Sequence, residues 1–240
     1  MITITRSNEH YQNKTDWFDT THHFSFAEYF DPNKMNFGPL RVFNDDMIKP
    51  GTGFDFHSHH YMEIVTYVID GTLEHKDNIG NKGIIEPGEV QTMTAGSGIT
   101  HSEYNHSTKD SLRLLQMWIF TNKKGLAPSW EQRKFTKEQR LNKFLPIAVP
   151  ENSKTDALHI HQDVSFYISS LTEGIQIKHE LRPVRKAYAF VIDDNMQIND
   201  NIMQTRDAAK VENENILLLK ATKPTELLFI DLPEKYVINQ

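Results

Sequence analysis

Residues 54–63 read FDFHSHHYME and residues 98–105 read GITHSEYN, and the fold can be worked out from these two short runs. Side chains of an extended strand alternate between two faces, so His57 and His59 share one face, and His101 and Glu103 share another. A barrel that sets the two strands side by side would direct three imidazoles and one carboxylate at a single point. Buried groups of this kind need partners. The spacing therefore predicts a metal site.

The alternative for a single His-x-His run is a solvent-facing strand. Two observations weigh against it here. The second run, about forty residues on, has the same spacing of two between its ligand-type residues, and the intervening segment is strongly apolar. We expect Phe54, Phe56, Ile64 and Tyr67 to form a buried sheet around the two runs.

Composition narrows the class of protein and of site. The 240 residues carry a net charge of −6, whereas a nucleic-acid surface needs a basic stripe, so direct DNA or RNA binding is not expected. There is no cysteine, which excludes disulfides, thiolate zinc sites and a cysteine nucleophile. No apolar run approaches the ~20 residues of a membrane span, and the N-terminus lacks the apolar core of a signal peptide. We expect a soluble, cytoplasmic monomer.

Short apolar runs between glycine and proline turns favour an all-β fold. Turns are indicated at Asp70-Gly71 and at Pro87-Gly88, and Leu112–Phe120 is predicted as the strand that closes the first unit. The aromatic-rich run at 16–29 is expected to pack across the barrel. Residues 121–157 are rich in charge and proline, which indicates a connection with one or two helical turns.

The second half repeats the first at an offset of 123 residues. Tyr67-Val68-Ile69-Asp70 recurs as Phe190-Val191-Ile192-Asp193, so two copies of one β-domain are predicted. We assign 1–132 to a metal-binding domain, 133–157 to a linker and 158–240 to a degenerate copy. In that copy Glu180 and Arg182 stand where His57 and His59 would be, and no histidine follows His179, so we expect no metal there.

The motifs resemble those of the cupin superfamily. Its first motif is matched by Gly51, His57, His59, Glu63 and Gly71, and its second by Gly98, His101 and Asn105, with Gly96 in place of the usual proline. Within the cupins the runs HHFSFAEYFDP, FGPLRVFNDD and PGEVQTMTAGSGITHSE are similar to those of pirins, densely over residues 20–135. The resemblance implies two tandem cupin barrels with a metal, commonly iron, in the first only.

Carried over from the pirins, the ligands fall on His57, His59, His101 and Glu103. Glu63 is the rival carboxylate, because many other cupins use that position; we expect it close to the site. Three imidazoles and one carboxylate suit one divalent first-row metal, iron first, with Mn, Ni, Co, Cu or Zn as alternatives. Four protein ligands on an octahedral ion leave two positions open, which dioxygen chemistry needs.

The resemblance implies quercetin 2,3-dioxygenase activity, in which dioxygen opens the central ring of a flavonol and carbon monoxide is released. Glu103 would serve both as ligand and as the base that accepts the 3-hydroxyl proton. The partners would be a small aromatic substrate, such as a flavonol, and O2. The alternative function is a metal-dependent regulator that binds a protein partner. A cavity over the metal would favour the enzyme, and a sealed metal under an exposed apolar patch would favour the regulator.

Overall fold

The computed structural model describes residues 1–236 and 238 and divides the chain into two compact units. The N-terminal unit comprises Tyr11–Lys134 and Leu158–Gln162. The C-terminal unit comprises Met1–His10, Phe135–Ala157 and Asp163–Tyr236. The first ten residues therefore belong to the second unit and 158–162 to the first, where the sequence assigned them the other way.

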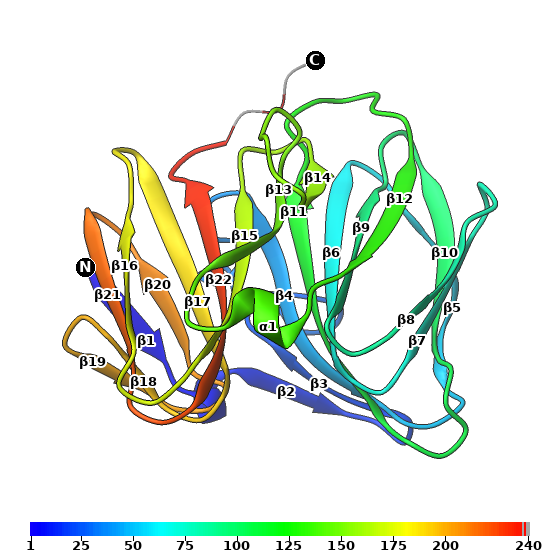
Figure 1. Ribbon diagram of the computed structural model, residues 1–240. Helices are drawn as coiled ribbons and strands as arrows, with labels where there is room; N and C mark the ends of the chain where they lie inside the picture. The colour runs from blue at the N-terminus through cyan, green and yellow to red at the C-terminus, as the bar shows by residue number, and fades with distance from the viewer. Residues whose placement is uncertain (237, 239–240) are drawn as a thin grey trace. The chain divides into compact units, whose positions relative to one another are not determined.

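The N-terminal unit consists of two antiparallel sheets (Figure 1). The larger sheet has the strand order β12-β9-β6-β11-β4-β3-β2, and the smaller sheet has the order β5-β10-β7-β8. The strands are β2 (Tyr11–Lys14), β3 (Phe18–His22), β4 (Leu40–Ile48), β5 (Gly53–His59), β6 (Met62–Asp70), β7 (Leu73–Asp77), β8 (Lys82–Ile85), β9 (Glu89–Thr94), β10 (Ile99–Asn105), β11 (Leu112–Phe120) and β12 (Ser129–Lys134), with β14 (Leu158–Ile160) in the same unit.

Apolar β-branched and aromatic residues hold the centre of the larger sheet. In β6 the run Ile64–Val68 is buried on both faces, which is why the strand reads as a continuous apolar run rather than an alternating one. The inner face packs against the smaller sheet through a cluster that includes Val68, Leu73, Ile85 and Leu114. The core thus lies between the sheets.

The C-terminal unit has the same two-sheet plan. One sheet contains the order β1-β20-β17-β22-β15-β13 and the other has the order β16-β21-β18-β19. The strands are β1 (Ile2–Thr5), β13 (Leu145–Pro150), β15 (Ser165–Leu171), β16 (Gln176–Glu180), β17 (Arg185–Asp193), β18 (Met196–Ile198), β19 (Asn201–Met203), β20 (Ala208–Val211), β21 (Ile216–Ala221) and β22 (Thr225–Pro233). Its helical segments are η1 (Ser7–Glu9) and α1 (Lys137–Arg140).

The strands confirm the predicted repeat. β6 begins at Met62 and β17 at Arg185, which is an offset of 123, and each lies between equivalent neighbours in its sheet. The offset falls to 113 by β11 and β22, which begin at Leu112 and Thr225, because the loops of the second copy are shorter. The all-β class, two tandem cupin barrels, is confirmed.

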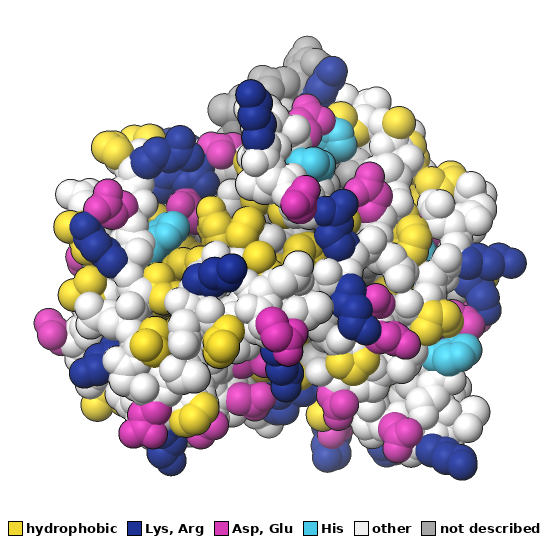
Figure 2. All heavy atoms as spheres, in the orientation of Figure 1, with side chains coloured by type: hydrophobic (Ala, Val, Ile, Leu, Met, Phe, Trp, Pro, Cys, Tyr) yellow, Lys and Arg dark blue, Asp and Glu magenta, His cyan; other side chains and the backbone are white. Residues whose placement is uncertain are grey.

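The surface and the helices are unremarkable for function. On the face drawn in Figure 2, Lys and Arg side chains are interspersed with Asp and Glu, so charge of neither sign forms a continuous field. Within residues 1–236 and 238, no helix is long and apolar enough to cross a membrane. The short helix α1 fulfils the expectation of a helical turn between residues 121 and 157.

Candidate metal centre

Two strands of the smaller sheet carry the predicted ligands. His57 and His59 lie on β5, and His101 lies on β10, opposite His57 across the antiparallel pair. Gly53 allows this close approach, since a Cβ atom there would lie 2.3 Å from the carbonyl oxygen of Glu103. A larger side chain would push the strands apart, so the glycine fixes the spacing between them.

A β-bulge in β5 aims these side chains. His101 pairs with His57 and Glu103 pairs with Phe54, so two residues of β5 oppose a single residue of β10. Within the bulge the side chain of Phe56 turns outward and is 56% exposed. The prediction that Phe56 is buried is wrong, because alternation from the inward-facing His57 places its neighbour Phe56 on the outer face. The bulge instead brings Phe54 to the same side as His57, where both line one cavity.

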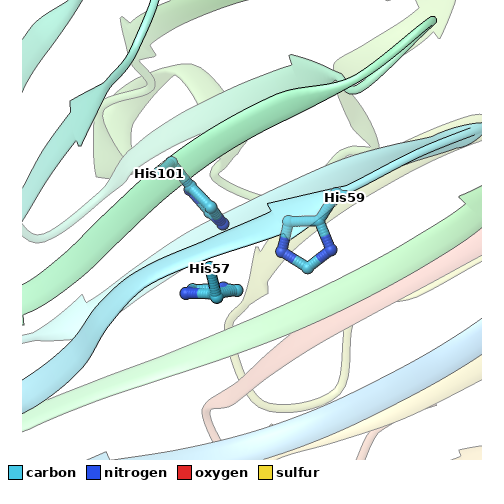
Figure 3. A group of neighbouring side chains, drawn as sticks. All are labelled: His57, His59 and His101. Carbon is cyan, nitrogen blue, oxygen red and sulfur yellow. The ribbon is translucent and has the colours of Figure 1, made fainter.

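The rings of the three histidines converge on one space (Figure 3). The ring centroids of His57 and His101 lie 4.5 Å apart, those of His57 and His59 4.8 Å, and those of His59 and His101 4.9 Å. One nitrogen from each ring lies within 4.8 Å of the other two. Three imidazole nitrogens at this separation form a donor set for a first-row transition metal.

Burial prepares these rings for coordination, which requires neutral imidazole. Burial, assisted by the rings of His101 and His57, lowers the pKa of His59 to about 3. Burial, assisted by His57 and His75, lowers the pKa of His101 to about 3 as well. His57 Nδ1 donates to the carbonyl oxygen of Asp55 at 2.7 Å, which leaves the Nε2 lone pair available. His101 Nε2 is buried and has no hydrogen-bond partner among the described residues, so the site fits a bound ion.

Glu103, on β10, is held by two amides. Gln91 Nε2 donates to Glu103 Oε1 at 2.7 Å, and Gln116 Nε2 donates to Oε2 at 2.7 Å. Each amide is fixed in turn by an indole: Trp130 Nε1 donates to Gln91 Oε1 at 2.8 Å. Trp118 Nε1 donates to Gln116 Oε1 at 3.0 Å. Because an indole N–H can only donate, both amides must turn their NH2 groups to Glu103, and both carboxylate oxygens accept.

A second buried group overlaps the first. His75, on β7, groups with His101 and Glu103, and the ligand atoms of these three residues also lie within 4.8 Å of one another. His75 Nδ1 lies 3.4 Å from His101 Nδ1, and His75 Nε2 lies 3.4 Å from Asp77 Oδ2. The ring stacks on Trp130, with centroids 5.0 Å apart. His75 thus contacts His101 through the Nδ1 atom and helps to hold its ring in place, a role that the sequence did not predict.

One cavity of about 180 Å³ opens onto the predicted ligands. Three of them, His57, His59 and Glu103, line it. Its apolar wall is formed by Phe18, Phe26, Phe54 and Trp118, and its polar wall by Asn13, Thr20, His22, Asn44, Asp46 and Gln116. The aromatic run at 16–29 therefore lies over the site, as expected, and a cavity remains beneath it.

A row of polar residues crosses the larger sheet below this cavity. Each lies opposite the next on adjacent strands, and the row consists of His22, Asn44, Gln116, Thr66 and Gln91. Neighbours in the row bond to each other: His22 Nδ1 lies 2.9 Å from Asn44 Oδ1, and Gln91 Nε2 lies 3.3 Å from Thr66 Oγ1. Burial lowers the pKa of His22. Buried polar groups are uncommon on the inner face of a sheet. Those of this row either line the cavity, as His22, Asn44 and Gln116 do, or lie next to it.

A second carboxyl faces the cavity from β4. Asp46 lies opposite Thr20 of β3, and Thr20 Oγ1 donates to Asp46 Oδ1. Burial, reinforced by the carboxylates of Asp45 and Glu103, raises the pKa of Asp46 to about 7 against the opposing bond from Thr20. The group therefore exchanges its proton near neutral pH.

The carboxylate of Glu63 binds a backbone segment distant in sequence. It is fully buried on β6, and its Oε1 accepts from the backbone N–H of His161 at 2.6 Å and lies 3.0 Å from His161 Nδ1. Its Oε2 accepts from the N–H of Gln162 at 2.9 Å. Both oxygens thus hold the returning segment 158–162, and Glu63 is in neither group of close ligand atoms among the described residues. The engagement of both oxygens does not support Glu63 as an alternate metal ligand.

In the C-terminal unit the equivalent positions differ. Glu180 lies opposite Ile216, where the first unit sets His57 opposite His101. Glu180 is exposed and its Oε1 pairs with Lys178 instead. The two groups of close ligand atoms found in the described residues both lie in the N-terminal unit.

Known proteins are similar to this chain over nearly its whole length. A family model described as pirin matches residues 4–119, and one described as the quercetinase C-terminal cupin domain matches 147–232. A quercetin 2,3-dioxygenase of Escherichia coli is 39% identical over 97% of this chain and 99% of its own. A pirin-like protein of Caulobacter vibrioides is 41% identical over 90% and 92%. The crystal structure of the bacterial pirin YhhW of Escherichia coli in complex with nickel(II) is 39% identical, covers 97% and 99%, and superposes with a TM-score of 0.92.

Proposed function

The chain belongs to the pirin family, and from this membership we propose that it is a metal-dependent dioxygenase of the quercetin 2,3-dioxygenase type. The observation that carries the proposal is the cavity of about 180 Å³ whose walls include His57, His59 and Glu103. A cavity gives a small molecule access to the ligands, which a site serving only regulation does not need.

His57, His59, His101 and Glu103 would hold one divalent transition metal, with iron first among the candidates and nickel supported by the relative that binds it. The neutral state of the buried imidazoles and the orphaned Nε2 of His101 support this set. Glu103 would be the fourth ligand of this set, because one of its carboxylate oxygens lies within 4.8 Å of a ring nitrogen of His101. When bound, the metal would activate dioxygen and a chelating substrate oxygen together.

The residues of the chain would do the remaining work. Glu103 accepts the proton of the substrate hydroxyl, because each of its oxygens uses one acceptor position for an amide and keeps another free. Phe18, Phe26 and Trp118 cover the cavity with apolar surface and keep bulk water from the reacting atoms. Trp118 also contacts the ring of His59 edge-on, with centroids 4.7 Å apart, and so fixes its orientation.

The volume of the cavity limits how much of a substrate can enter it. Sites for drug-sized ligands are typically ~300–1,000 Å³, and this one is about 180 Å³. A three-ring flavonol would place its hydroxy-ketone edge and about one ring inside and extend the rest through the mouth. Quercetin is therefore the test substrate, and a more compact molecule with the same chelating edge is an equally good candidate for the physiological one.

The test uses purified protein stripped of metal and reloaded separately with Fe(II), Mn(II), Ni(II), Co(II) or Cu(II). Mixed with quercetin in air, the loaded protein should remove the flavonol absorbance, consume oxygen and release carbon monoxide, at a rate that depends on the metal. The control is His101→Ala treated in the same way, which corrects for oxidation of quercetin by free metal. Equal rates for the variant and the natural chain would refute the proposal.

Glu103→Gln separates the two duties of the carboxylate. An amide oxygen can still coordinate, so we expect metal content to be largely retained while turnover falls by about 10²–10⁴-fold, the usual contribution of a positioned base. Metal content is measured by elemental analysis and turnover by carbon monoxide release. Unchanged turnover would remove Glu103 from the base role.

A further inference from the structure

Two cross-strand pairs make up four of the six residues in the polar wall of the cavity. Thr20 lies opposite Asp46, and His22 lies opposite Asn44, with each pair bridging β3 and β4. All four side chains line the cavity, and their residues are buried, with 3–5% of their surface exposed. His22 and Asn44 hydrogen-bond to each other, with 2.9 Å between the ring Nδ1 and the amide Oδ1.

The pairing is incomplete for Asp46. Its Oδ1 accepts from the hydroxyl of Thr20, and within the part of the chain that the structure describes no bond to its Oδ2 is found. Oδ2 is not among the fully buried unpaired atoms, so this oxygen is open to the cavity that Asp46 lines. A ligand that covered this oxygen without bonding to it would leave a dehydrated, unpaired carboxyl, which costs more than a typical hydrogen bond contributes. Arg113, the cation on the neighbouring strand β11, is already engaged by Asp45 on the other face of β4, at 3.0 and 3.1 Å.

We propose that Asp46, held by Thr20, recognises a hydroxyl group of the bound substrate remote from the metal-binding edge, and so determines specificity at this site. The inference rests on the proposed function, because it takes the substrate to be a hydroxylated planar molecule whose other end would be held by the metal that His57, His59, His101 and Glu103 would bind.

The geometry favours a hydroxyl over other groups. A carboxyl can accept from a hydroxyl when ionised and can donate to it when protonated, so it pairs with a hydroxyl in either state. A carboxylate on the ligand would meet both Asp46 and Glu103, which repel it. An entirely apolar ligand would leave Asp46 Oδ2 unpaired, and a site built to bond a hydroxyl discriminates strongly against the analogue that lacks it.

The alternative is that Asp46 only joins β3 to β4. In that case the bond from Thr20 would be its whole contribution, and loss of the carboxyl would affect every ligand equally. The two explanations differ in one measurable quantity, the ratio of affinities for ligands with and without remote hydroxyls.

The experiment compares quercetin with 3-hydroxyflavone, which keeps the chelating edge and lacks every other hydroxyl. Nickel-loaded protein is titrated without oxygen, and binding is followed by quenching of tryptophan fluorescence. The variants are Asp46→Leu, Asp46→Asn and Thr20→Val, with Asp19→Asn as the matched control. Asp19 is also on β3 but alternates to the other face, where it pairs with Lys14 at 3.1 Å.

The natural chain should prefer quercetin by about tenfold or more, from the usual value of a satisfied bond to a carboxyl. Asp46→Leu should bring the ratio close to one by weakening quercetin alone, Asp46→Asn should retain part of it, and Asp19→Asn should leave it unchanged. Unaltered binding of 3-hydroxyflavone by Asp46→Leu also demonstrates that this variant is folded.

Two results would overturn the proposal in distinguishable ways. If Asp46→Leu keeps the full preference, or loses affinity for both ligands equally, Asp46 has no part in specificity, while turnover of quercetin by the natural chain still supports the dioxygenase. If the natural chain, correctly loaded with metal, neither binds nor turns over either flavonol, the proposed function fails and the assignment of Asp46 fails with it.

Discussion

Replacing Gln91 with leucine should weaken metal binding although Gln91 touches neither the metal-binding histidines nor the cavity. Gln91 is 1% exposed and does not line the cavity, so its effect must pass through Glu103, to which it donates at 2.7 Å. Leucine has a similar volume, so the main losses are the bond to Glu103 and the acceptor of the Trp130 indole.

The size of the effect follows from these two bonds. A hydrogen bond to a charged group contributes about 1.5–3 kcal/mol, and an indole N–H left without an acceptor costs about 1–3 kcal/mol. Trp130 is only partly buried, so its share lies at the low end. We expect a loss of about 2–4 kcal/mol in the free energy of unfolding. Mutation of a residue that orients a ligand typically costs 10–100-fold in metal affinity.

Competition with a chelator of known affinity measures nickel binding, and urea denaturation measures stability. The control is Gln132→Leu. Gln132 lies on β12 directly opposite Gln91, and its Nε2 donates to the carbonyl oxygen of Ile84 at 3.2 Å. Gln132→Leu should bind nickel like the natural chain. If Gln91→Leu loses stability but keeps full nickel affinity, the amide does not orient a ligand, and the ligand role of Glu103 falls into doubt with it.

Three further outcomes are expected. Glu63→Ala should lower the free energy of unfolding by about 2–4 kcal/mol, since two buried N–H groups lose their acceptor, yet the metal content should stay the same; loss of metal would restore Glu63 as a ligand. The metal-free protein should lose stability as the pH falls from about 6.5 towards 3, because the folded state keeps His59 and His101 neutral at a pKa of about 3 while the unfolded state takes up protons. Asp46, with its raised pKa of about 7, opposes this trend in part; a flat urea-denaturation profile over this range contradicts the burial of the histidines. Gly53→Ala should separate β5 from β10 and abolish nickel binding, given the 2.3 Å approach to a carbonyl oxygen; wild-type nickel affinity in a folded Gly53→Ala protein would argue against it.

Local periodicity was sufficient to predict the strands and the convergence of the histidines. His57, His59 and His101 are spaced so that an ordinary antiparallel pair brings them together, and the pair forms as expected. The offset of 123 similarly predicted the position of β17 from that of β6. Both inferences depend only on the spacing of residues within one or two strands, which can be read directly from the sequence.

The residues around the site depend on which strands become neighbours, and the sequence does not state this. Gln91 and Gln116 look like ordinary polar positions until β9, β6 and β11 are placed side by side, when they fall in one row beneath Glu103. Glu63 has the parity of a ligand, but its distant partner segment at 161–162 takes both oxygens. Phe54 and Phe56 were expected to share the buried face, but the bulge between Phe54 and His57 leaves Phe54 inside and Phe56 outside, and no turn residue indicates this bulge.

The exchange of short segments between the two units constrains the order in which the chain can fold during synthesis. β1 pairs with β20, with Ile2 opposite Val211, so during synthesis β1 must wait for its partner strand until residue 211 has been made. At ~5–20 residues per second this wait is about 10–40 s. Glu63 likewise remains without its partners until His161 and Gln162 emerge. The N-terminal unit is therefore not finished when residue 134 is made, and no single cut in the chain separates two complete halves.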